Sequence, residues 1–276
     1  MKPEAMVAQE ALVLLTRDFA KYHRNVVGMY LLSIYDMELG SAFRSGYYFV
    51  RHIDDVLDGD RQVSCDSLAY VQNLRSQVET GNYRNGSIAT LAEHAINLLE
   101  RKKKPEDDPR LDFLRSIDSI VFDYERARIR RVLTKAQLED YYYRAFDPVV
   151  NLSLIGLTPF LRSRDIPIMS YGSGRVYSVR DLSIDWIKGI INLPKEVLER
   201  ARLTTSSTLE EIQNSAEVQD WFSSVLTATR SELFDLQRQL KATQNGVTNF
   251  ILGGKIKLML RFIDMREHSQ AQISLF

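Results

Sequence analysis

The sequence predicts an all-α protein, and three observations support that prediction. Apolar residues recur three and four positions apart along almost the whole of the 276-residue chain. Period-two alternation between turn residues, the pattern of a half-buried strand, is scarce. Several segments also begin with helix-capping residues. Because 45% of the residues are hydrophobic and the composition is that of an ordinary globular protein, we predict one helical domain over residues 1–276.

Breakers and capping residues divide the chain into a series of predicted helices. Thr134 with Gln137 and Ser207 with Glu210 have capping-box spacing, and Pro194 suits a first helical turn. The charged segment "RKKKPEDDPR" is predicted to be a solvated link. Its mixed charges and two prolines could mark a domain boundary, but the helices on its two sides are similar in character, so we predict one domain. The predicted helices cover residues 4–23, 26–57 with Gly40 as a candidate break, 65–79, 87–102, 111–132, 135–160, 168–189, 194–202, 208–243 and 248–268.

The charge balance and the single cysteine exclude several classes of protein. Lys+Arg and Asp+Glu both number 36, so the positive field that attracts nucleic acid is missing and we expect no nucleic-acid partner. Cys65 cannot form an internal disulfide, and no Cys/His cluster has zinc spacing. The apolar run "ALVLL" near the N-terminus is too short and too closely flanked by charge for a signal peptide or a membrane span. A cytoplasmic location is therefore expected.

The segment "YYFVRHIDDVLDGD" places acidic residues inside an otherwise apolar helix. Asp54, Asp55 and Asp58 fall on or beside one helix face, with Arg51 one turn earlier and Tyr47 one turn before that. Buried carboxylates must be paired, protonated or bound to metal, and one arginine does not neutralise three acids. A solvated acidic helix end explains this cluster equally well when it is considered alone.

A second segment, "YSVRDLSIDWIKG", repeats the pattern with Tyr177, Arg180, Asp181 and Asp185. The repetition favours a functional interpretation of both clusters. Pairs of carboxylates one turn apart suit Mg²⁺, with Mn²⁺ as the alternative ion, because such hard cations bridge one or two carboxylates to substrate phosphates. The implied ligand is a diphosphate.

Two such helices facing one another across a cavity would hold Mg²⁺ ions on the diphosphate. Arg51, Arg180 or Lys188 would supply positive charge as the leaving group departs. The carbocation left behind requires a dry cavity, and each aromatic face that contacts it contributes about 0.5–2 kcal/mol. The candidate wall residues, some of which we expect to be ordinary core, are Tyr22, Phe43, Tyr47, Tyr141, Tyr142, Tyr143 and Phe146.

Both acidic segments resemble the two aspartate-rich motifs of the squalene/phytoene synthase family. The residues that carry the resemblance are "YYFVRHIDDVLD" and "VRDLSIDWIKGIINLPKEVL", and "FDYERARIRRVLTKAQLEDYYY" is similar to the family's segment between the motifs. The resemblance implies an isoprenoid-synthase-type helical bundle around a central cavity. It also implies a Mg²⁺-dependent enzyme that joins two allylic prenyl diphosphates, farnesyl or geranylgeranyl, head to head through a cyclopropylcarbinyl diphosphate.

The resemblance also implies roles for individual residues. Asp54 and Asp58 would be Mg²⁺ ligands with Asp55 in support, and the opposing ligands would be Asp181 and Asp185. The residues that would contact the diphosphate or order the site are Tyr47, Arg51 and Arg180, and the residue beside the cation would be Tyr141.

Several positions depart from the family's pattern. Gly174 and Tyr177 stand where the family usually carries glutamine and asparagine, and Ile190 and Asn192 replace an arginine and a tyrosine. The segment "FDPVV" replaces a small-residue stretch. These departures keep two alternatives open: a terpene synthase or cyclase that ionises a single prenyl diphosphate, and a non-catalytic helical assembly protein.

Other features leave several questions open. "YGSGR" is not a nicotinamide-binding fingerprint, but squalene synthases use NADPH without one, so use of NADPH stays open. Arg126 and Arg130 share a helix face, which is either solvated or a second phosphate contact. The C-terminal "FILGGKIKLMLRF" is either a last core helix or a peripheral membrane contact. The sequence also leaves the substrate's chain length and the oligomeric state open.

Overall fold

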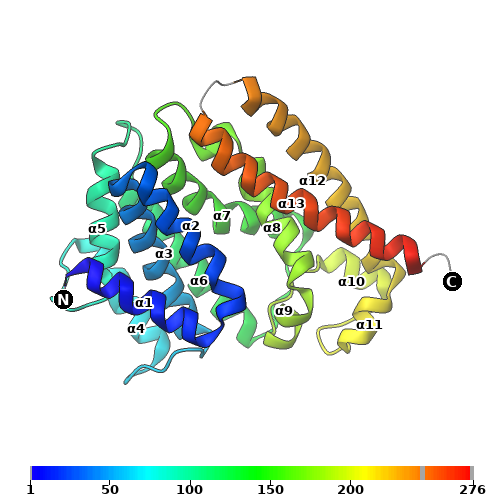
Figure 1. The fold of residues 1–276 in the computed structure, drawn as a ribbon. Helices are drawn as coiled ribbons and strands as arrows, with labels where there is room; N and C mark the ends of the chain where they lie inside the picture. The colour runs from blue at the N-terminus through cyan, green and yellow to red at the C-terminus, as the bar shows by residue number, and fades with distance from the viewer. Residues whose placement is uncertain (1, 243–245, 274–276) are drawn as a thin grey trace. The chain divides into compact units, whose positions relative to one another are not determined.

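A computed structural model of the chain describes residues 2–242 and 246–273 (Figure 1). In these ranges the chain forms thirteen α-helices and one short 3-10 helix and no strand, which confirms the all-α prediction. The chain divides into two compact units: unit 1 holds Met1–Tyr124 and Asn151–Arg162, and unit 2 holds Glu125–Val150 and Ser163–Phe276. The single domain over residues 1–276 stays a prediction.

Helix α3 is the central element of unit 1. It packs most extensively against α5 and α2 and also contacts α1 and α4. Helices α6 and α7 each supply residues to both units. The helices with residues in unit 1 are α1 (Pro3–Arg17), α2 (Phe19–Tyr35), α3 (Met37–Leu57), α4 (Ser67–Thr80), α5 (Ala89–Glu100), α6 (Pro109–Arg128) and α7 (Lys135–Leu157).

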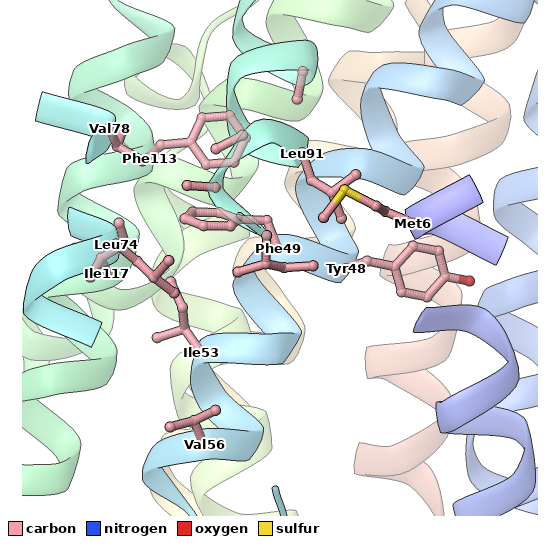
Figure 2. Packing of buried hydrophobic residues seen from close by; sticks show 14 of the residues in the cluster. Met6, Tyr48, Phe49, Ile53, Val56, Leu74, Val78, Leu91, Phe113 and Ile117 are labelled. Carbon is pink, nitrogen blue, oxygen red and sulfur yellow. The ribbon is translucent and has the colours of Figure 1, made fainter. Parts of the chain in front are cut away.

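The core of unit 1 holds α3 from two sides (Figure 2). Phe49 meets Phe113 of α6 edge to face, with ring centroids 6.0 Å apart, and Ile53 continues the same row one turn later. Tyr48 points the other way, beside Met6 of α1. Burial of each large apolar side chain contributes about 1.5–3 kcal/mol. These contacts fix the helix whose last turn carries the first acidic motif.

The N-terminal helices break at residues that differ from the predicted ones. The predicted helices 4–23 and 26–57 are three helices, separated at Asp18 and Asp36 instead of at Gly40. The Asp36 side chain caps α3 by accepting a hydrogen bond from the Leu39 N–H, 2.9 Å away. That bond, together with an ion pair to Lys102, lowers the pKa of Asp36. A capping side chain therefore overrides apolar periodicity here.

Unit 2 also contains breaks where one helix was predicted. The segment 168–189 is two helices that meet at Asp181, and 208–243 is two helices that meet at Ser215, with residue 243 outside the described ranges. Helix α12 lies beside α13, and α8 packs against both (Figure 1). The elements of unit 2 after α7 are η1 (Ser163–Asp165), α8 (Ile168–Arg180), α9 (Leu182–Lys188), α10 (Lys195–Ala201), α11 (Leu209–Asn214), α12 (Ala216–Ala242) and α13 (Gly246–Ile273).

Of the three predicted helix starts, one is confirmed as predicted and two are displaced by one position. Thr134 accepts from the Gln137 N–H at 3.3 Å, and the Gln137 side chain accepts from the Thr134 N–H at 3.0 Å. The second predicted box is one residue too early, because Thr208 rather than Ser207 caps α11. Pro194 occupies the cap position of α10 instead of its first turn. Capping motifs are local, so the sequence identifies them to within about one residue.

The link at residues 101–110 is not wholly solvated as predicted. Asp107 is buried and forms an ion pair with Arg162, whose Nη2 lies 2.7 Å from the carboxylate. Burial alone raises the pKa of Asp107, but hydrogen bonds from Arg162 and from the Lys104 N–H hold it below its ordinary value. The link is therefore attached to unit 1 by a buried charge pair.

The last helix, α13, has one packed face and one exposed face. Ile256 and Met259 are buried, whereas Phe250 and Leu258 are largely exposed. Over the described residues, we find no helix with the length and apolarity that crossing a bilayer requires. Peripheral membrane contact by this segment stays a prediction.

Candidate active site

The first acidic motif lies at the C-terminal end of α3, in unit 1. Asp58 caps the helix, with its N–H 2.8 Å from the Asp54 carbonyl oxygen, and its side chain is exposed. The Asp54 carboxylate accepts a hydrogen bond from Arg51 at 2.6 Å, and 34% of its side chain is exposed. Asp54 and Asp58 are thus one turn apart at the exposed end of an anchored helix.

Asp55, between them in sequence, is directed into unit 1. Only 1% of its side chain is exposed, and its carboxylate meets Arg51 at 2.5 Å and Arg17 at 2.9 Å. Both guanidinium groups also lie near Asp60, at 3.9 Å and 3.7 Å respectively. This buried position favours the supporting role that the resemblance implies for Asp55 over direct metal coordination.

Arg17 is the second arginine that contacts Asp55, and sequence reasoning did not identify it. It ends α1, and its Nη2 donates to the hydroxyl of Tyr22 at 2.8 Å. The guanidinium groups of Arg17 and Arg51 lie 5.2 Å and 5.4 Å from the centre of the Tyr22 ring. A basic residue in the last turn of a helix is a recognisable signal, but the sequence gives no indication of its partner. Tyr22, a predicted wall residue, therefore packs against both arginines.

Negative charge is concentrated at Asp54. Loss of hydration raises its pKa to about 6, and the charges of Asp58, Asp55 and Asp123 act in the same direction while Arg51 opposes them. A group of like charges is relieved when a cation binds among them. This electrostatic state is the one expected of a carboxylate that binds metal.

A buried polar network supports the motif from behind. Arg61 donates to Glu10 at 2.7 and 2.9 Å and to the His52 Nδ1 at 2.6 Å, and its own N–H bonds the Asp55 carbonyl oxygen at 2.9 Å. Because Nδ1 accepts that bond, the neutral His52 ring presents Nε2–H to the Tyr70 hydroxyl, 3.1 Å away. The network connects α1, α3 and the loop after the motif.

The second acidic motif, in unit 2, lies across a helix break and not within one helix as predicted. Asp181 separates α8 from α9, with φ −97° and ψ 7°. The Asp181 N–H still bonds Tyr177, and the Asp185 N–H bonds Asp181, both at 2.8 Å, so the four-residue steps survive. Arg180 forms a two-point contact with the Asp181 carboxylate at 2.8 and 2.6 Å.

Asp185 is held by an amide. The Asn192 Nδ2 donates to its carboxylate at 2.8 Å, and the Asn192 Oδ1 accepts from Arg126 at 2.7 Å. Arg126 is buried, and its guanidinium lies 4.3 Å from the centre of the Tyr141 ring. One face of Tyr141, the residue expected beside the cation, is thus occupied by a fixed positive charge. The sequence had suggested either a solvated face or a phosphate contact for Arg126.

Two residues that depart from the family's pattern, Gly174 and Tyr177, make close contacts in the structure. A Cβ at Gly174 would come within 2.4 Å of the Tyr142 Cβ, so the glutamine expected there cannot fit without movement of the backbone. The Tyr177 hydroxyl accepts a hydrogen bond from Lys255 of α13, and the Lys255 and Arg180 cations lie 4.6 and 4.3 Å from its ring centre. Tyr177 is therefore in contact with two cationic side chains, and one of them, Arg180, also bonds Asp181.

The remaining predicted residues are placed as follows. Lys188 ends α9 with an exposed side chain, and Tyr47 is half-buried in α3, 5.4 Å from the ring of Tyr48. Phe146 contacts the Tyr177 ring, with centroids 5.6 Å apart. Within each unit the structure brings carboxylates and an arginine together. That the two motifs face one another across a central cavity stays a prediction.

The donor chemistry of both motifs fits Mg²⁺. Their carboxylate oxygens are hard ligands, and Mg²⁺ usually keeps waters and takes substrate phosphate oxygens as well. Among residues 2–242 and 246–273, no three His, Cys, Asp or Glu side chains converge into a site built from protein ligands alone. Two carboxylates per ion, completed by substrate oxygens, are the arrangement that these residues can supply.

Comparison with known proteins identifies the family. The family model described as squalene/phytoene synthase matches residues 29–263, a range that includes both acidic motifs. A search of the curated proteins found no match. The predicted resemblance and the prediction of a prenyl-transferring enzyme with an isoprenoid-synthase-type fold are confirmed at this level. The chain belongs to the squalene/phytoene synthase family, whose members are prenyltransferases.

Proposed function

We propose that this enzyme joins two allylic prenyl diphosphates head to head, through a cyclopropylcarbinyl diphosphate, in a Mg²⁺-dependent reaction. Farnesyl and geranylgeranyl diphosphate are the proposed substrates. The observation that supports the proposal most strongly is that each motif keeps two carboxylates one turn apart with an arginine bonded to one of them: Arg51 on Asp54 and Arg180 on Asp181. Each motif therefore offers carboxylates for Mg²⁺ and an arginine for a phosphate oxygen, which supports the proposed binding of a diphosphate.

The proposed roles follow from the geometry of each motif. Asp54 and Asp58 in unit 1, and Asp181 and Asp185 in unit 2, would hold the Mg²⁺, which when bound supplies positive charge to the departing diphosphate. The Arg180 side chain is 49% exposed, so it can reach a diphosphate oxygen as well as Asp181. Buried Asp55 fixes the direction of two guanidinium groups.

Two observations favour a second candidate, a terpene synthase that ionises a single prenyl diphosphate. The Arg126 guanidinium covers one face of Tyr141, and its charge repels a carbocation at that ring. The close approach of Gly174 to Tyr142 also fills space where the family's pattern places a larger side chain. Both differences affect the steps that follow ionisation, and neither affects the carboxylates.

Product analysis distinguishes the candidates. The full chain is incubated with Mg²⁺ and either farnesyl or geranylgeranyl diphosphate, with and without NADPH, and pyrophosphate and the hydrocarbon products are measured. A C30 or C40 product supports head-to-head joining, and a C15 or C20 product supports the single-substrate reaction. If neither substrate releases pyrophosphate, both candidates are wrong and the non-catalytic assembly protein is the remaining interpretation. Replacement of Mg²⁺ by Mn²⁺ tests which ion is used.

A further inference from the structure

The carboxamide of Asn192 bridges a buried cation and a motif carboxylate. Its Oδ1 accepts from the Arg126 Nη2 at 2.7 Å, and its Nδ2 donates to the Asp185 Oδ2 at 2.8 Å. Hydrogen bonds in which one partner is ionised are shorter and stronger than neutral ones, and both of these bonds are of that kind. Asn192 therefore bonds a buried guanidinium through its oxygen and a motif carboxylate through its nitrogen.

Burial and charge fix the orientation of the bridging amide. Arg126 is 1% exposed and Asn192 is 7% exposed, so neither side chain exchanges its partners for bulk water. A flipped amide would place its NH₂ group against the guanidinium donors and its oxygen against the carboxylate. Both contacts would then be repulsive. The Asn192 side chain has one favourable orientation, and that orientation presents an N–H to Asp185.

The backbone turns after α9, and this turn places Asn192 beside Asp185. Gly189 ends α9 with φ +87°, and a Cβ there would lie 2.5 Å from the Ala127 carbonyl oxygen, so this position requires glycine. The following Ile190 N–H bonds the Asp185 carbonyl oxygen at 2.8 Å. The Arg130 Nη1 donates to the Trp186 carbonyl oxygen at 3.1 Å. The turn after α9 is thus fastened to the end of α6.

A second bond from Arg126 keeps the bridge in place. Its Nη1 donates to the Ile191 carbonyl oxygen at 3.2 Å, and Ile191 is fully buried. The guanidinium also lies against the Tyr141 ring, which restricts its movement on that side. The same cation therefore holds both the backbone before Asn192 and its side-chain oxygen. Rotation of the amide away from Asp185 would break the bond to Arg126 as well.

We propose that Asn192 is a positioning residue that orients the Asp185 carboxylate for Mg²⁺, with Arg126 holding the amide in place. The inference rests on the proposed function, because it takes Asp185 to be a metal ligand. Hydrogen bonds to a metal ligand typically change metal affinity by about 10–100-fold when they are removed. The expected effect is thus on Mg²⁺ affinity and not on folding alone.

The test measures Mg²⁺ affinity without turnover. Thermal unfolding of the full chain is followed at a fixed concentration of inorganic pyrophosphate while Mg²⁺ is titrated. In Asn192→Leu we expect the Mg²⁺ concentration for half of the maximal rise in melting temperature to increase about 10–100-fold. The matched control is Asn151→Leu in unit 1, where Nδ2 donates to the Asp112 carboxylate at 2.7 Å. Its Mg²⁺ midpoint should equal that of the wild type.

Asn192→Ala, which needs no additional space, provides the same measurement if the leucine variant does not fold. A wild-type Mg²⁺ midpoint in the Asn192 variants overturns the inference and leaves the proposed function intact. An equal rise in the Asn192 and Asn151 variants also overturns it, because the effect would then be a general loss of packing. If the wild type shows no Mg²⁺-dependent shift with pyrophosphate, the proposed function itself is wrong and the inference is wrong with it.

Discussion

The two acidic motifs share their spacing but differ in how their carboxylates are supported. In the first, Asp55 is held by direct ion pairs with Arg17 and Arg51, inside a continuous helix anchored in an apolar core. In the second, the motif crosses a helix break, and Asp185 is held by the neutral amide of Asn192. The buried aspartate of the first motif thus has two ion pairs, whereas Asp185 of the second motif accepts an oriented hydrogen bond from an amide.

Because the support differs, substitutions in the two motifs should affect different properties. Removing one partner of a buried ion pair leaves an uncompensated charge, and this is costly to the folded state. Removing a hydrogen bond that orients a carboxylate costs less stability but disturbs its geometry. Interior substitutions in the first motif should therefore affect folding, and those around the second should affect ligand binding.

The largest expected effect is common to the two motifs. Asp54→Asn and Asp181→Asn should each lower the rate of Mg²⁺-dependent pyrophosphate release by about 10³-fold, because a metal ligand contributes several kcal/mol to transition-state charge stabilisation. Stopped assays of pyrophosphate at saturating Mg²⁺ measure the change. The controls are Asp118→Asn in unit 1 and Asp235→Asn in unit 2, which are exposed aspartates paired with Arg75 and Arg238. Unchanged release in both motif variants would contradict the assignment.

The second-largest expected effect is a loss of stability, and we expect it only for the first motif. Asp55→Ala should lower the free energy of unfolding by about 3 kcal/mol, because Arg17 and Arg51 lose a buried counter-charge. Asp60→Ala is the matched control: Asp60 faces the same two arginines but is 44% exposed and farther from them, so we expect less than about 1 kcal/mol. Denaturant unfolding measures both values. Equal losses would mean that burial does not distinguish the two aspartates.

The third effect is acid sensitivity of the network behind the first motif. Burial alone raises the pKa of Glu10, but the nearby His52 ring and the hydrogen bonds and charge of Arg61 hold it below its ordinary value of 4.5. A depressed carboxylate pKa adds stability above the unfolded value, and this stability is lost as the pH falls through the folded value. The free energy of unfolding should therefore decrease below about pH 4.5.

Glu10→Gln should flatten that decrease, and Glu4→Gln, an exposed residue of the same helix, should leave its slope as in the wild type. Denaturant unfolding at a series of pH values measures the slopes. Identical slopes in the Glu10 variant and the wild type would show that this network does not contribute.

The smallest effect is expected at the second motif's ion pair. Arg180 and Asp181 are 49% and 32% exposed, so Arg180→Met should change the free energy of unfolding by less than about 1 kcal/mol. Arg51→Met, which leaves buried Asp55 with one arginine, should cost more. The difference between these two variants, measured by denaturant unfolding, is the sharpest comparison of charge support in the two motifs. If Arg180→Met lost more free energy of unfolding than Arg51→Met, the predicted order of the two motifs would be wrong.

Local patterns predicted the features that depend on local physics. Helical periodicity gave the all-α class, four-residue spacing gave the carboxylate pairs, and the pairing of Thr134 with Gln137 gave a correct cap. The same patterns predicted helices that are too long. Asp36 caps a new helix inside one predicted helix, and Asp181 interrupts a second predicted helix. At Asp36 the side chain bonds the backbone and competes with helix propagation, and periodicity does not register that competition. Asp181 makes no such cap bond, and its carboxylate is instead paired with Arg180.

The sequence by itself determined that this protein is helical, that it carries paired carboxylates at helical spacing, and which family it resembles. Helical spacing placed Arg51 beside Asp54 and Asp55, but only the tertiary structure decided the distant groups that complete each motif. Arg17 is 38 residues from Asp55, Arg126 is 66 residues from Asn192, and Lys255 is 78 residues from Tyr177. The physical reason is that helix spacing is set by bonds a few residues apart, whereas these partners meet only when packed helices bring distant segments together.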